Sequence, residues 1–200
     1  MNTQTVKKSK IRKLSITSVM AAASAILMFI ETPLPFFPSF LQIDASDLPA
    51  VLCSFAIGPA WGIAVQLIKN LIHMLATKTM VAGEVANFLI GAAFVLPAGV
   101  VYNKIHTKKG AILGLTLGTV FMTVIGILTN YFITLPLYSR LMPIDAIIEL
   151  SSKANPYIKD VFTLILYGIT PFNFFKGVAI SLLSLLIYKP LSPILRYTKQ

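Results

Sequence analysis

Long apolar runs alternate with short charged connections along the whole chain, and this alternation limits the protein to a membrane fold. The runs cover residues 14–30, 48–57, 60–75, 85–102, 111–135 and 171–188. Charged residues make up 12% of the chain, against roughly 25% in soluble domains. Because about 20 apolar residues cross a bilayer as a helix, we expect an all-α integral membrane protein. It would have six transmembrane helices in a single membrane domain, residues 1–200.

The run 48–57 is short for a span, and it could join the run 60–75 in a single helix. Gly58-Pro59 separates the two runs, and proline blocks the continuation of a helix. We therefore predict two separate spans, the first of them short or tilted. The preceding Ser46-Asp47-Leu48-Pro49 has the pattern of a helix start, an N-cap followed by an early proline.

The formal net charge of +10 does not form the basic face of a nucleic-acid-binding protein, because the basic residues lie at the chain ends and in short connections. With six spans and the amino terminus inside, 11 of the 17 basic residues fall on the inner side, as the positive-inside rule requires. Both termini are therefore predicted to be cytoplasmic. The inner residues are Lys7, Lys8, Lys10, Arg12, Lys13, Lys104, Lys108, Lys109, Lys189, Arg196 and Lys199.

The connections on the predicted outer side, 31–47 and 138–170, are long and rich in aromatic residues. Within the second, residues 157–167 are apolar but too short to span, so we expect a helix lying on the outer mouth. Gly168 would end this helix, and Thr170-Pro171 would start the last span with a cap and a first-turn proline.

Polar residues inside apolar helices are costly in lipid and mark functional sites by default. Asn173 and Lys176 are three positions apart and so share one face of the last span; the alternative is a structural asparagine beside a snorkelling lysine. Asn130 lies in the outer third of the fifth span, where an interhelical hydrogen bond is the alternative. For Lys69, snorkelling at a helix end is the favoured interpretation.

Glu84 and Asn87, also three apart, begin the fourth span, where a helix dipole alone would explain the acid. All these polar groups lie in the outer half of the predicted bundle. With the aromatic loops they could line one pocket open to the outside. Amides, a lysine and aromatic rings suit a flat, hydrogen-bonding organic ligand better than an ion.

Signatures of catalysis are missing from the sequence. There is no phosphate-binding loop of the G-x-x-x-x-G-K-[ST] type, and His73 and His106 do not have metal-ligand spacing. The lone Cys53 is expected to be a buried apolar residue. We therefore predict no catalytic residues, no metal and no enzyme activity.

Two stripes of small residues suggest close helix packing. Ser18, Ala21, Ala22 and Ala25 lie in the first span, and Gly110, Gly114 and Gly118 open the fifth. Packing within the bundle and contact with a partner are equally compatible with these stripes.

Six short segments follow one another along the chain: Leu41–Pro49, Gly58-Pro59, Leu67–Leu71, Gly83–Phe88, Thr129–Phe132 and Pro171–Gly177. Their order within six spans resembles that of the riboflavin-binding S components of energy-coupling factor (ECF) vitamin transporters. The resemblance implies a multi-pass subunit of a prokaryotic cell membrane that captures riboflavin from outside and needs no cofactor. It also implies partners, namely a separate transmembrane subunit and two cytoplasmic ATPase subunits.

The resemblance also assigns roles to residues. It implies a docking pattern, Ala-x-x-x-Ala, at Ala21 and Ala25, and a flavin pocket built from Gln42, Glu84, Asn87, Asn130, Asn173 and Lys176. An asparagine amide can pair with the carbonyls and N–H of the flavin ring. Two alternatives remain: a related subunit for another vitamin or purine-like compound, and an intramembrane enzyme acting on a lipid or prenyl group. The absence of paired acids or a histidine cluster within the spans counts against the enzyme.

Overall fold

Helices occupy most of the chain in a computed structural model, which describes residues 3–77 and 81–197. One short hairpin departs from the all-α expectation: β1 and β2 pair antiparallel, with Thr32 opposite Ile43. The elements in chain order are α1 Thr3–Met28, β1 Thr32–Pro33, β2 Gln42–Ile43, α2 Asp47–Ile57, α3 Pro59–His73, η1 Met74–Ala76, α4 Ala82–Lys104, α5 Lys108–Thr129, η2 Asn130–Thr134, α6 Leu135–Tyr138, α7 Ile144–Ala154, α8 Val161–Leu164, η3 Ile165–Ile169 and α9 Thr170–Tyr197.

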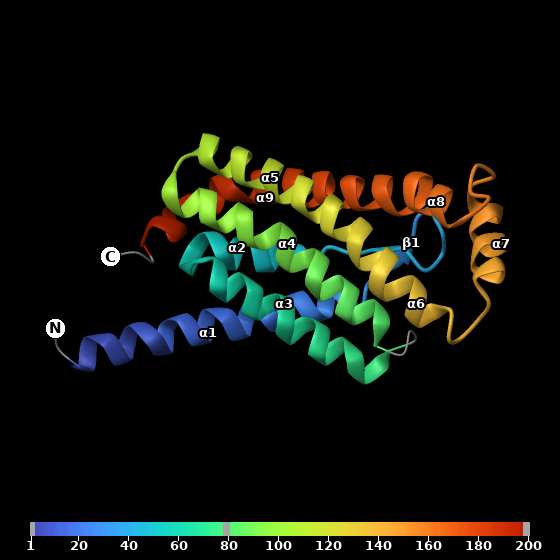
Figure 1. The fold of residues 1–200 in the computed structure, drawn as a ribbon. Coiled ribbons are helices and arrows are strands. Elements are labelled where there is room, and N and C mark those ends of the chain that lie inside the picture. The colour runs from blue at the N-terminus through green and yellow to red at the C-terminus, as the bar shows by residue number, and fades with distance from the viewer. Residues whose placement is uncertain (1–2, 78–80, 198–200) are drawn as a thin grey trace.

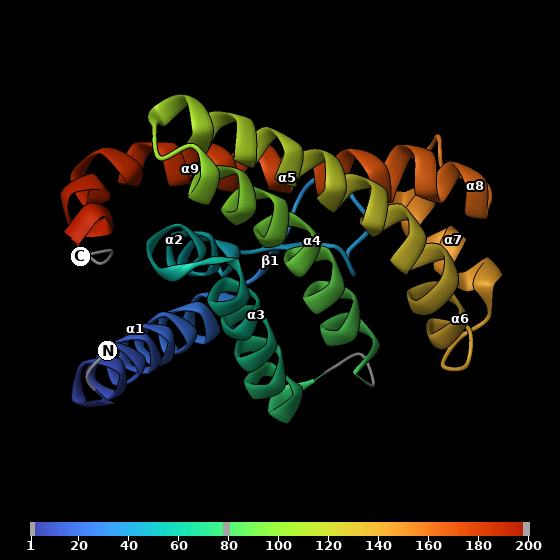
Figure 2. The same ribbon diagram turned by 60° about the vertical axis from the view of Figure 1, so that its left-hand side comes forward.

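The helices form an elongated bundle whose two ends differ. α1 begins and α9 ends at the same end of the bundle, while α7 covers the opposite end (Figure 1). Figure 2 shows that the first turns of α1 project away from the other helices. The start of α1 and the end of α9 therefore lie at one end of the bundle, and the long loops gather at the other.

Among the described residues, four stretches are long and apolar enough to cross a membrane: Ser9–Met28, Ala82–Lys104, Lys108–Tyr138 and Val161–Ile187. With 11 and 15 residues, α2 and α3 are shorter. Large apolar side chains such as Ile26, Phe121 and Leu182 are more than half exposed. An apolar outer surface of this kind is stable in contact with lipid and unfavourable in water.

The predicted break between the second and third apolar runs is confirmed. Gly58 has φ +114°, a left-handed value that glycine adopts without a steric penalty, and Pro59 begins α3. The predicted start of α2 is also confirmed, at Asp47. Ser46, however, makes no side-chain cap bond; its hydroxyl accepts a hydrogen bond from Lys69 instead.

The prediction of a separate helix over residues 157–167 is wrong. From Val161 onward this segment is the beginning of the last long helix, which continues through Gly168 and Pro171 into α9. A π-helical turn, η3, makes this continuity possible. Within it the Thr170 N–H bonds to the Ile165 carbonyl, and the wider turn accommodates the proline that follows. The separate helix at this end of the bundle is α7.

The small residues of α1 face two directions. Ala21 and Ala25 are 2% and 4% exposed, inside the bundle, whereas Ser18 and Ala22 are exposed. In this structure the chain's own helices cover most of the surface of the two predicted docking alanines.

The glycines of α5 pack within the bundle. A Cβ atom at Gly114 would come within 2.6 Å of the Ala98 carbonyl oxygen, and one at Gly118 within 2.6 Å of the Phe94 carbonyl oxygen. α5 therefore lies directly against the backbone of α4. The sequence left open whether this stripe packs within the bundle or contacts a partner. The contact with α4 supports packing within the bundle.

Candidate functional site

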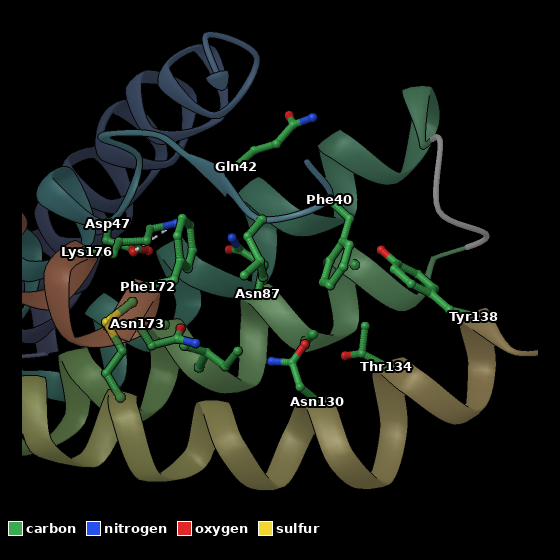
Figure 3. A pocket seen from close by; sticks show the side chains of 16 residues that line it. Phe40, Gln42, Asp47, Asn87, Asn130, Thr134, Tyr138, Phe172, Asn173 and Lys176 are labelled. Atoms are coloured by element: carbon green, nitrogen blue, oxygen red, sulfur yellow. Dashed lines mark ion pairs between the residues drawn. The ribbon is translucent and has the colours of Figure 1, made fainter. Parts of the chain in front are cut away.

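A cavity opens at the loop end of the bundle, between α4, η2, α9 and the loop before α2 (Figure 3). Its empty space, together with the open mouth, is about 560 Å³. Five of the six predicted site residues line it: Gln42, Asn87, Asn130, Asn173 and Lys176. The other lining residues are Phe40, Leu41, Asp47, Gly83, Ala86, Ile90, Gly91, Met122, Thr134, Tyr138 and Phe172.

A π-helical turn presents one wall of the cavity. η2 interrupts the α-helical hydrogen bonding after α5, and its first and last residues, Asn130 and Thr134, both line the cavity. π-helical turns inside longer helices are frequent at functional sites. The Asn130 amide nitrogen donates to the Gly126 carbonyl at 2.8 Å. This bond fixes the side chain and leaves its oxygen available to a ligand.

Asn173 approaches from the facing helix, α9, in the same manner. Its amide nitrogen donates to the Ile169 carbonyl at 2.9 Å. The side chain packs against Gly126, where a Cβ atom would come within 2.7 Å of the amide nitrogen. The missing side chain at Gly126 therefore makes the room that Asn173 occupies.

Three aromatic rings enclose the polar groups. Phe40 and Tyr138 meet edge to face, with ring centroids 5.8 Å apart, and Phe172 lies on the other side of the cavity near Asp47 and Lys176 (Figure 3). The neighbouring Phe174 and Phe175 are about half exposed on the outside of α9. Of the three phenylalanines around Asn173, only Phe172 can therefore contact a ligand in this cavity.

Two acceptors in the cavity wall lack partners. Asn87 Oδ1 and Thr134 Oγ1 are buried, and neither has a hydrogen-bond partner among the described residues. A buried polar atom without a partner costs roughly 1–3 kcal/mol. Such atoms indicate that a hydrogen-bonding molecule completes the site.

Lys176 does not snorkel; it belongs to a buried ion cluster. Its ammonium lies 2.8 Å from Asp44 Oδ2 and 3.7 Å from Asp47 Oδ2. Figure 3 shows the pair with Asp47 at one edge of the cavity. Burial alone would raise the pKa of Asp44, but Lys176, and after it Lys69, holds that pKa below its usual range. The Asp44 carboxylate is thus kept ionised against Lys176.

Lys69 belongs to the same cluster, so the snorkelling interpretation of this residue is wrong. Its side chain is 0% exposed, and its ammonium lies 2.6 Å from both Asp47 Oδ1 and Ser46 Oγ. Gln66 donates a further bond to Asp47 Oδ1, at 2.8 Å. Two lysines and two aspartates thus form one buried ion cluster, in which loss of one member leaves a costly unpaired charge.

Glu84 lies outside the main cavity. It lines a neighbouring cavity that shares Phe40, Gln42, Gly83, Asn87 and Tyr138 with the first. Its carboxylate contacts His73 Nδ1 at 3.0 Å and the Thr77 hydroxyl at 3.0 Å. His73 is therefore a partner of Glu84 at the mouth rather than an isolated surface histidine.

Gln42 lies at the junction of the two cavities. With its amide nitrogen turned toward Glu31, the distance to Glu31 Oε1 is 2.7 Å. The mouth is thus acidic and polar, while the deeper wall consists of amides, aromatic rings and the ion cluster.

Within residues 3–77 and 81–197, no group of three or more His, Cys, Asp or Glu side chains could hold a metal ion.

Sequence reasoning did not assign roles to several residues that form the site. The sequence pattern assigns Asp47 only to a helix start, and it gives no signal for Thr134, Phe40 or Tyr138. One signal could have identified the ion cluster: two lysines inside spans require two buried anions, and Asp44 and Asp47 lie together at the end of one loop. The aromatic residues carry no such signal, because only the fold brings Phe40 of the loop and Tyr138 of α6 together at the cavity.

Comparison with known proteins gives consistent results. The family described as "ECF transporter, substrate-specific component" matches residues 12–188. A riboflavin transporter, RibU, of Staphylococcus aureus (strain TCH60) is 38% identical over 185 residues, which are 92% of this chain and 93% of the relative. The riboflavin transporter FmnP of Bacillus subtilis (strain 168) is 34% identical over 187 residues, covering 92% and 94%.

A solved structure extends the similarity to the fold. The chain described under "Structure and mechanism of the S component of a bacterial ECF transporter" superposes with a TM-score of 0.76 at 35% sequence identity. The match covers 93% of this chain and 98% of that one.

Proposed function

This chain belongs to the substrate-specific components of ECF transporters, and on that premise we propose that it captures riboflavin from outside the cell for uptake. It is a membrane transport subunit and not an enzyme. The relatives that are 38% and 34% identical over nearly their whole length are riboflavin transporters. The observation in the structure that supports riboflavin is a cavity that combines unpartnered acceptors, amides and aromatic walls in one place.

The chemistry of the cavity suits a flavin. The pyrimidine edge of the ring presents an N–H between two carbonyls, which matches amide groups that both donate and accept. Asn130 and Asn173 each use one amide hydrogen in a bond to the backbone. The oxygen of either residue can accept from the single ring N–H, and the second amide hydrogen can donate to a ring carbonyl. Phe40, Tyr138 and Phe172 provide apolar contact for the ring. The polar mouth around Gln42 suits the ribityl hydroxyls.

We assign substrate contact to Gln42, Asn87, Asn130, Asn173 and Lys176. Thr134 is added, since its buried hydroxyl has no partner among the described residues. Glu84 would act at the mouth, through His73 and Thr77, rather than on the ring.

We further propose a single membrane domain that crosses the bilayer six times, through α1, α2, α3, α4, the α5–α6 helix and the α8–α9 helix. Both chain ends would be cytoplasmic and the cavity would face outward. The common location of the ends of α1 and α9 (Figure 1) supports this arrangement. Several of the basic residues that motivate it, among them Lys7, Lys8, Lys78, Lys189 and Arg196, have side chains outside the described residues.

The energy for uptake would come from a separate ECF module, with a transmembrane subunit and two cytoplasmic ATPase subunits in a prokaryotic cell membrane. Purification tests the proposal at once. The protein should co-purify with riboflavin from cells grown with the vitamin, and it should be yellow with flavin absorbance in the visible. A colourless preparation that retains no flavin absorbance after riboflavin is added and the unbound vitamin is removed would contradict the proposal.

A further inference from the structure

The buried ion cluster contains one member that lies behind the cavity wall. Asp47 and Lys176 line the cavity, while Lys69 lies behind Asp47 on α3 and is fully buried. The two oxygens of Asp47 are divided between the two lysines: Oδ1 faces Lys69 at 2.6 Å and Oδ2 faces Lys176 at 3.7 Å. Lys69 therefore contacts Asp47, which adjoins Lys176, but Lys69 itself does not line the cavity.

We propose that Lys69 is a positioning residue for riboflavin binding, which holds Asp47 so that the Lys176 ammonium stays at Asp44 beside the cavity. This inference rests on the proposed function. It concerns a residue that acts through Asp47 and Ser46, not through contact with the ligand.

Charge balance is the first argument. Two lysines and two aspartates give the cluster no net charge. Without Lys69, the Lys176 ammonium would be the one cation that the described residues bring to the two buried carboxylates. Coulomb attraction is strong at these distances in a buried site. Lys176 would then be drawn from its 2.8 Å contact with Asp44 toward Asp47, and its distance from a bound ring would change.

The loop before α2 gives the second argument. The Lys69 ammonium also donates to the Ser46 hydroxyl at 2.6 Å, and the Ser46 backbone N–H donates to Asp44 Oδ1 at 2.7 Å. One lysine thus holds the turn that carries Asp44, two residues after Gln42. Loss of Lys69 would loosen the same turn from which the cavity receives Gln42 and the partner of Lys176.

Three variants test the inference by titration of riboflavin fluorescence on folded, monodisperse protein. Lys69→Met removes the charge and keeps the length. Lys69→Gln is a second neutral variant that can still donate to Asp47, so the test does not depend on one variant folding. Lys153→Met is the matched control, because Lys153 is exposed and pairs only loosely with Glu149, at 3.5 Å.

Both Lys69 variants should bind riboflavin at least about tenfold more weakly than the unmodified protein, whereas Lys153→Met should bind normally. The visible absorption of the bound flavin should also shift in the Lys69 variants, since a nearby ammonium changes the electronic environment of the ring. A residue that only stabilised the fold would leave the affinity and spectrum of the folded fraction unchanged.

The double variant Asp47→Asn/Lys69→Met restores a neutral cluster of one lysine and one aspartate. It should bind riboflavin more tightly than Lys69→Met and recover the spectrum of the unmodified protein. Unchanged affinity and spectrum in both Lys69 variants, or a double variant that binds no better than Lys69→Met, would overturn this inference alone. If the unmodified protein fails to bind riboflavin, the proposed function falls first and this inference with it.

Discussion

Lys176 of α9 lies 2.8 Å from Asp44 of the loop before α2, although 132 positions separate them in the chain. This ion pair joins the last long helix to the loop that closes one side of the cavity. Both side chains are almost completely buried, so neither charge is stable there without the other. The pair is therefore a structural link and also a wall of the candidate binding site.

Removal of the Lys176 charge should weaken riboflavin binding and lower stability together. Lys176→Met leaves Asp44 without its cation and removes a donor from the cavity. We expect at least a tenfold loss of affinity, equivalent to about 1.4 kcal/mol, and a lower midpoint of thermal unfolding in detergent. Asn173→Ala, which leaves the cluster intact, should lose similar affinity without the same loss of stability. Equal affinities for Lys176→Met and the unmodified protein would remove Lys176 from the site.

Asn87 should show the opposite balance between stability and binding. Its buried Oδ1 has no partner among the described residues, and replacing an unsatisfied group by an apolar one of similar shape is neutral or stabilising. Asn87→Leu should therefore unfold at the same temperature as the unmodified protein, or higher, without ligand. It should bind riboflavin at least about fivefold more weakly, for the loss of roughly 1 kcal/mol. Lower stability with unchanged affinity would show that Asn87 serves the fold alone.

Bulky substitutions on α1 should separate docking from folding. Ser18 and Ala22 are exposed, so Ser18→Trp and Ala22→Trp should leave riboflavin binding by purified protein intact and reduce uptake by cells, if a partner packs there. Ala21→Trp and Ala25→Trp place bulk inside the bundle and should reduce stability and binding as well as uptake. Binding that survives Ala21→Trp and Ala25→Trp while uptake is lost would instead support the Ala-x-x-x-Ala docking pattern.

Single cysteines test the proposed topology. In a Cys53→Ala background, Phe36→Cys places a thiol in the loop between β1 and β2, where Phe36 is 78% exposed. Lys108→Cys places one at the exposed start of α5. An impermeant thiol reagent added to intact cells should label the first and not the second until the membrane is opened. The reverse pattern would invert the proposed orientation.

The sequence predicted the long helices well because membrane helices carry a strong, local signal. The break at Gly58-Pro59 was also predictable, since both residues act through their own backbone. The outer segment 157–169 was not. Its course depends on the π turn at Ile165–Ile169, and nothing in the local pattern distinguishes a proline that starts a helix from one that a π turn accommodates.

Part of the candidate site was predictable because its polar residues also give a local signal. The acidic partners of its lysines were not predictable. Asn130, Asn173 and Lys176 stand out as polar residues in apolar runs, and five of the six predicted residues meet in one cavity. The partners of the lysines did not stand out. Asp44 and Asp47 lie where a loop ends and α2 begins, a place where acids are ordinary, and only the fold shows that they are buried against Lys69 and Lys176.

Titration of riboflavin fluorescence with the purified protein tests the central claim most directly. We predict saturable quenching at one riboflavin per chain. Non-fluorescent flavin analogues should displace the bound riboflavin and restore its fluorescence, whereas a purine or an unrelated vitamin should not. Asn130→Ala and Asn173→Ala should each weaken the binding by about tenfold or more. No saturable quenching by folded, monodisperse protein, or tighter binding of a different vitamin, would contradict the assignment of this chain as a riboflavin-capturing subunit.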